Sequence, residues 1–89
     1  MDKNRILVRR GDVLEAEVDG DRVLMSGSDF KYFGLVGTGA LVWDRIDGTV
    51  TLGAIIKNLA EEFSVDANQV DNDVVEFVSA LDSAGLIER

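Results

Sequence analysis

The spacing of apolar residues changes near residue 37, and this change constrains the fold more than any other feature of the chain. Before it, apolar residues alternate with polar ones, as in half-buried strands. After it, they recur at every third or fourth position, as in amphipathic helices. Strands followed by helices predict an α+β fold. The chain contains no proline, linker or internal repeat, so we expect residues 1–89 to form a single domain.

Three short strands are expected in the first third of the chain. Residues 13–18 alternate, residues 19–21 (Asp-Gly-Asp) have the composition of a tight hairpin turn, and residues 22–25 continue as a second strand. After a second turn signal, residues 30–36 form an aromatic-rich third strand. One face of this strand carries Phe33 and Leu35, and the other carries Phe30 and Tyr32. We expect Phe33 to lie on the covered face of the sheet.

Three helices are expected to follow. Thr38, Thr51 and Asp66 each precede an apolar-periodic stretch and are predicted N-caps. Gly48 and Gly85 follow the first and third helices, as glycines that end helices do. The predicted core face of the third helix consists of Val70, Val74, Phe77 and Leu81. The resulting arrangement is a three-stranded antiparallel sheet followed by three helices, and it is similar to a winged helix-turn-helix.

A second stripe on the third helix has two interpretations. Asp71, Val75, Val78 and Asp82 share this side of the helix, so it is half apolar and half acidic. On the first interpretation Val75 and Val78 widen the core contact. On the second they form the wall of a groove that holds apolar side chains, flanked by the two carboxylates.

Charge is distributed unevenly along the chain. Residues 58–88 contain eight carboxylates and no Lys or Arg, and the net charge of the chain is −8. A helical segment that is rich in carboxylates repels the phosphates of nucleic acids. Phosphate contacts need Lys or Arg, so we expect no nucleic-acid binding. Arg5, Arg9 and Arg10 are the residues from which a basic patch elsewhere could start. The negative surface predicts a cationic partner, such as a basic peptide or protein.

Residue types that support most catalysis are missing. The chain has no His and no Cys, which removes the commonest general base, thiolate chemistry and most transition-metal ligands. Carboxylates that are close together in the sequence, such as Glu61 and Glu62, have the spacing of an exposed helix face and not of a catalytic pair. We therefore expect a non-enzyme without metal or cofactor. No apolar stretch is long enough to span a bilayer, and no targeting signal is visible, so we expect a cytoplasmic protein without membrane contact.

Several segments in one order and spacing resemble a known family. They are residues 31–35 (KYFGL), 39–43 (GALVW), 46–48 (IDG), 49–52 (TVTL), 63–66 (FSVD) and 85–87 (GLI). Over about residues 13–88 the chain is similar to the PqqD-like recognition elements for precursors of ribosomally made, post-translationally modified peptides. The aromatic pair before Gly34 and the later Trp43 resemble the stand-alone members of lasso-peptide pathways. One departure is Val36, where many relatives have Asn or Asp.

The resemblance implies a function. Such domains bind the leader segment of a precursor peptide and present it to a leader peptidase and a cyclase. The leader adds as a strand beside the third strand and lies against the third helix. Carried over to this sequence, the peptide-binding residues are Phe30, Lys31, Tyr32, Phe33, Gly34, Leu35, Asp71, Val74, Val75, Val78 and Asp82. Two alternatives stay open: an acidic adaptor for a basic protein, and a winged-helix DNA-binding protein.

Overall fold

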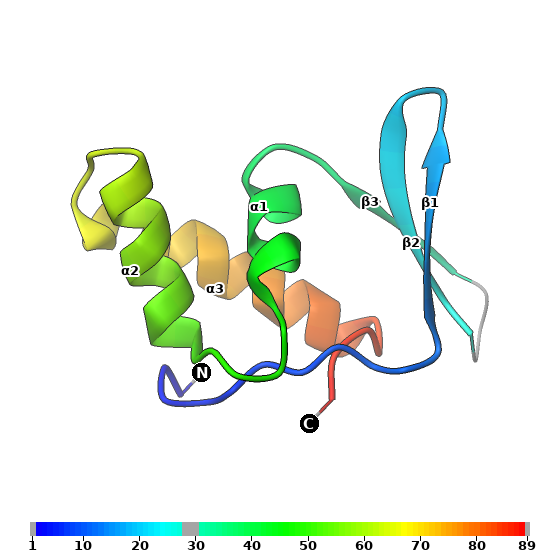
Figure 1. Ribbon diagram of the computed structural model, residues 1–89, viewed down its shortest axis with the longest axis horizontal. Helices are drawn as coiled ribbons and strands as arrows, with labels where there is room; N and C mark the ends of the chain where they lie inside the picture. The colour runs from blue at the N-terminus through cyan, green and yellow to red at the C-terminus, as the bar shows by residue number, and fades with distance from the viewer. Residues whose placement is uncertain (1, 28–30, 89) are drawn as a thin grey trace.

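The computed structural model describes residues 2–27 and 31–88. A three-stranded sheet lies at one end of the molecule and the helices lie at the other (Figure 1). The elements in chain order are β1 (Val13–Val18), β2 (Asp21–Ser26), β3 (Tyr32–Leu35), α1 (Thr38–Arg45), α2 (Leu52–Glu62) and α3 (Ala67–Ser83). The predicted α+β arrangement of three strands and three helices is confirmed.

The sheet is an antiparallel meander in the order β1-β2-β3. Asp19 and Gly20 both have positive φ angles, 53° and 85°, which suits a two-residue turn whose twist matches that of the flanking strands. Leu24 in the central strand faces the helices and is fully buried. The opposite face of the sheet, which carries Leu14 and Tyr32, is exposed.

Side-chain caps and glycines fix the helix ends. The Thr51 hydroxyl accepts a hydrogen bond from Ala54 N at 3.1 Å, and the Asp66 carboxylate accepts one from Asn68 N at 3.0 Å. Both predicted caps are confirmed. The prediction for Thr38 is wrong by one residue, because Gly37 occupies the N-cap position with a φ of 53° and no side-chain cap. Gly85, with a φ of 73°, follows α3 as predicted.

An extended N-terminal arm, residues 2–10, holds the two ends of the helical part together. Its backbone bonds to the start of α2, where Leu52 N donates to Arg5 O at 2.9 Å. It also bonds to the C-terminus, where Glu88 N donates to Val8 O at 2.8 Å. Figure 1 shows the arm in blue running below the helices toward β1. Leu7 in this arm is 0% exposed, so the arm is part of the core.

Trp43 of α1 joins the arm to the sheet. The Arg9 guanidinium lies 4.5 Å from the centroid of the indole ring, and Arg9 Nη2 donates to Trp43 O at 2.6 Å. On the other side, Trp43 Nε1 donates to Glu15 Oε1 of β1 at 2.5 Å. Glu15 also pairs with Arg22, which in turn pairs with Asp44 and lowers the pKa of that carboxyl. This network sets the distance between the sheet and the helices.

We expect Leu7→Ala to lower the free energy of unfolding by about 2–5 kcal/mol, because it leaves a cavity in the core. Its neighbour Ile6 is 51% exposed, and Ile6→Ala serves as the matched control, with an expected cost below about 1 kcal/mol. Urea unfolding followed by Trp43 fluorescence measures both. Equal, small effects would show that the arm is not part of the core.

Candidate functional site

The outer edge of β3 has backbone groups available for another strand. Ser26 N donates to Lys31 O at 3.4 Å, which makes this a hydrogen-bonded pair of the β2–β3 ladder. Because such pairs alternate in antiparallel sheets, the N–H and C=O groups of Tyr32 and Gly34 point away from β2. In the described part of the chain no strand covers this edge. A Cβ added at Gly34 would meet nothing within 4 Å, so a second backbone can approach closely there.

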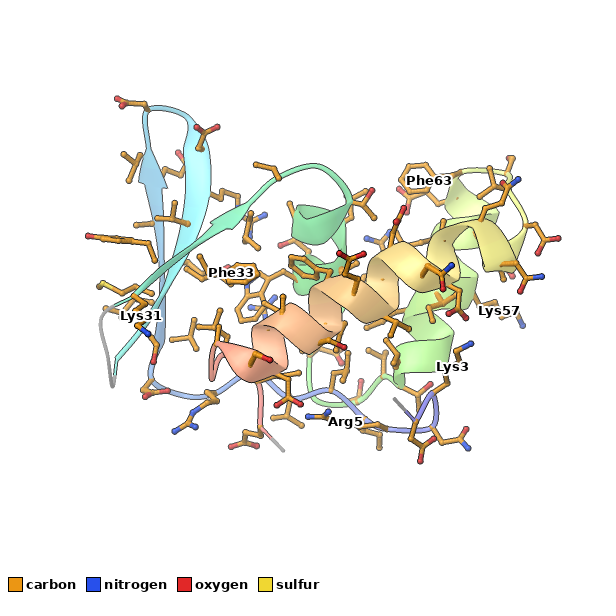
Figure 2. The ribbon with its side chains drawn as sticks, turned by 180° about the vertical axis from the view of Figure 1, so that it is seen from behind. Lys3, Arg5, Lys31, Phe33, Lys57 and Phe63 are labelled. Carbon is orange, nitrogen blue, oxygen red and sulfur yellow. The ribbon has the colours of Figure 1, made fainter. Side chains whose placement is uncertain are left out.

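An aromatic pair connects β3 to α3. The rings of Phe33 and Phe77 meet edge to face, with centroids 5.7 Å apart and an interplanar angle of 71°. Both side chains are half-buried. In Figure 2 the labelled Phe33 points from β3 toward α3. Gly39 of α1 makes room for this arrangement, because a Cβ there would lie 2.6 Å from Phe77 Cε1. The pair is therefore held in place from three elements.

Two flanks of α3 carry side chains at the same spacing. One flank consists of Asp73, Phe77, Ala80 and the C-cap residue Ala84, and we call it the β3-side flank because Phe77 contacts Phe33 of β3. The other consists of Asp71, Val75, Val78 and Asp82, and we call it the arm-side flank. At 3.6 residues per turn the two flanks lie about 160° apart around the helix, with the core between them.

The N-terminal arm neutralises the arm-side flank. Lys3 forms an ion pair with Asp71, and Arg5 Nη1 lies 3.4 Å from Asp82 Oδ2. Figure 2 shows the labelled Lys3 and Arg5 on the arm that runs beside α3. The two carboxylates that the sequence analysis placed beside a bound peptide are thus already paired within the chain. The contact between α3 and β3 is made from the opposite flank.

The predicted binding residues differ widely in exposure. Tyr32 is 74% exposed and Gly34 is exposed, so both are accessible on β3. Leu35 and Val74 are buried in the core. Phe30 lies outside the described residues. No contact in the structure tests peptide binding by any of them, and their role stays a prediction.

The burial of Val78 bears on the two interpretations of the second stripe of the third helix. Its side chain is 0% exposed and belongs to the core, which favours the first interpretation of the second stripe. Its part in peptide binding stays a prediction. Val75 is half-buried and packs against the same core. The helical wheel placed Val78 at the margin of the core, and packing of α3 against its neighbours covers that margin.

Sequence reasoning missed the β3-side flank as a candidate surface. Phe77 had been assigned wholly to the core, whereas it is half-buried. Asp73 and Glu76 are exposed, and no ion pair among the described residues involves them. The basic residues Lys3 and Arg5 were the signal that could have distinguished the two flanks, since they supply intrachain partners for one of them.

The described residues contain no group of three or more His, Cys, Asp or Glu side chains placed to hold a metal ion. Within the same part of the chain, no helix has the length and apolar character needed to cross a membrane. The arrangement on β3 and α3 offers backbone hydrogen bonds, an aromatic surface and negative charge. These are features with which a protein holds an extended polypeptide.

Comparisons with known proteins identify relatives of the chain. A family model described as "Coenzyme PQQ synthesis protein D (PqqD)" matches residues 21–87. Proteins described as "PqqA binding protein" from two strains of Xanthomonas campestris pv. campestris, B100 and 8004, are each 38% identical over 47 residues. That match covers 53% of this chain and 51% of each relative, so the chain matches about half the length of these curated relatives.

Two solved structures have a similar fold. One, described as "TbiB1 in Complex with the TbiA(beta) Leader Peptide", is 28% identical, with a TM-score of 0.77 over 91% of this chain and 94% of the other. The second, described as "Lasso peptide synthetase B1 complexed with the leader peptide", is 22% identical, with a TM-score of 0.79 over 96% of this chain and 100% of the other. The second likeness concerns the fold alone.

We expect Val78→Asp to remove most of the stability of the domain, because a carboxylate buried without a partner costs more than about 4 kcal/mol. Ser79→Asp adds the same charge one residue later at an exposed position, and its expected effect lies within about 0.5 kcal/mol. Circular dichroism during thermal unfolding compares the two. A folded Val78→Asp variant with an unchanged melting temperature would contradict the burial of this side chain.

Proposed function

The chain belongs to the PqqD family, and we propose that it binds the leader segment of a ribosomally made precursor peptide without catalysing a reaction itself. Residues 1–89 act in this proposal as one peptide-recognition domain. The observation that carries it is the edge of β3 that no strand covers among residues 2–27 and 31–88, together with a similar fold at 28% identity whose described complex contains a leader peptide. The absence of His and Cys from the chain supports a binding role.

The leader adds to the sheet as a fourth strand. Tyr32 and Gly34 supply the outward backbone groups, so each exchanges hydrogen bonds with the peptide. Alternate side chains of the peptide then face α3, beside Phe33 and Phe77. The peptide-binding surface thus consists of β3 and the β3-side flank of α3. We place Asp71 and Asp82 outside it, because Lys3 and Arg5 already pair with them.

The bound leader is presented to processing enzymes. A lasso-type pathway, with a leader peptidase and a cyclase as partners, is the form of the proposal that the aromatic pair before Gly34 and the later Trp43 support. In this proposal a separate enzyme acts on the peptide that the chain holds. Because the precursor is made on ribosomes, the proposal also places the protein in the cytoplasm.

Gly34→Pro tests strand addition directly. Proline removes the outward N–H of residue 34 while leaving the bonds to β2 intact, and edge strands tolerate it. We expect the dissociation constant of a fluorescein-labelled leader peptide from a ribosomally made precursor to rise about tenfold or more in fluorescence anisotropy.

The matched control is Gly34→Ala, which keeps the N–H and whose Cβ meets nothing within 4 Å. We expect it to bind the leader within about twofold of the unmodified chain, since no hydrogen bond is lost. Both variants are first shown to be folded by circular dichroism. Equal affinity of the proline and alanine variants would rule out strand addition at this edge.

A further inference from the structure

The negative charge of α3 is divided by the N-terminal arm into a paired and an unpaired half. The helix contains Asp71, Asp73, Glu76 and Asp82 and no Lys or Arg. Lys3 and Arg5 compensate the first and last of these. No ion pair among the described residues involves the other two, which are exposed. The uncompensated charge therefore lies toward the β3-side flank.

That charge lies next to the aromatic pair. Asp73 precedes Phe77 by four residues on the same flank, and Glu76 is the residue directly before Phe77. Phe77 in turn contacts Phe33 of β3. A carboxylate and a half-buried aromatic surface thus follow each other along the helix, separated by about 6 Å of axial rise.

An extended peptide has a matching repeat. In a strand, side chains two residues apart point to the same side and are separated by about 6.6 Å. A peptide strand that lies along the β3-side flank can therefore place the side chain of one residue on the Phe33–Phe77 pair. The side chain two residues away in the peptide then lies beside Asp73 and Glu76. The two carboxylates attract a cationic peptide side chain to this position.

We propose that the site selects an extended peptide with a Lys or Arg two residues from an apolar side chain, the apolar group packing on Phe33 and Phe77 and the cation pairing with Asp73 and Glu76. This inference rests on the proposed function, because it names the class of peptide that the same site takes. Backbone bonds at β3 hold any extended chain, whereas these four side chains distinguish one chain from another.

The size of the effect follows from exposure. Asp73 and Glu76 are open to solvent, so their attraction for a cation is screened by salt and acts mainly on the association rate. We expect the double variant Asp73→Asn, Glu76→Gln to bind the labelled leader peptide about fivefold to tenfold more weakly at low ionic strength. The difference shrinks at 0.5 M salt because the Debye length falls below about 5 Å.

The matched control removes two negative charges from the arm-side flank of the same helix, α3. Asp71→Asn, Asp82→Asn releases Lys3 and Arg5, so we expect a lower melting temperature but a leader affinity within about twofold of the unmodified chain. A second comparison uses a leader peptide in which each Lys or Arg in turn is replaced by Gln. One of these replacements should weaken binding of the peptide to the unmodified chain. The same replacement should leave the affinity of the peptide for the Asp73→Asn, Glu76→Gln variant unchanged, because the carboxylates that pair with this cation are already removed.

The outcomes separate this inference from the proposed function. If both double variants weaken binding equally, net charge alone is at work and the inference fails. If neither weakens it while the unmodified chain still binds the leader, the inference also fails and the proposed function stands. If the unmodified chain binds no leader peptide at either salt concentration, the proposed function itself fails.

Discussion

The relative position of the sheet and the helices depends on the contacts of one buried side chain, Trp43. Its indole is covered by Arg9 of the N-terminal arm and donates a hydrogen bond to Glu15 of β1. A domain of 89 residues has a small core, so a large aromatic residue fixed from two sides contributes much of its rigidity. The Phe33–Phe77 contact, and with it the candidate site, exists only if α1 and the sheet keep this distance.

The N-terminal arm has a second effect, on the electrostatics of α3. In a helix with four acidic side chains and no basic one, the negative charges repel one another and destabilise the helix. Lys3 and Arg5 reduce that repulsion by pairing with Asp71 and Asp82. Because both partners come from one arm on one flank, the relief is asymmetric. The same contacts that stabilise the helix therefore leave its negative charge on the side that faces β3.

Local chemistry made the elements predictable, and long-range packing made the site hard to predict. The Asp19-Gly20 turn, the Thr51 and Asp66 caps and Gly85 are set by neighbouring residues, so the sequence predicts them well. The choice between the two flanks of α3 is different, because both have the same spacing and each contains at least one acid. Only the arm and Phe33 distinguish them, and both are more than 35 residues away in the chain. The arm itself has a single short apolar run at Ile6-Leu7-Val8, too short to show a period.

Strand addition explains how one fold can serve different peptides. Backbone hydrogen bonds at the β3 edge depend on the conformation of the added chain and not on its side chains, so they supply affinity without discrimination. In the proposed binding mode, discrimination comes from the few side chains beside that edge, which are Phe33, Phe77, Asp73 and Glu76. Asp73 and Glu76 are exposed and can change without disturbing the core, whereas Phe33 and Phe77 are half-buried and pack against it. In the proposed mode, the fold that the chain shares with the solved structures at TM-scores of 0.77 and 0.79 supplies the strand edge, and the side chains beside that edge supply the selectivity.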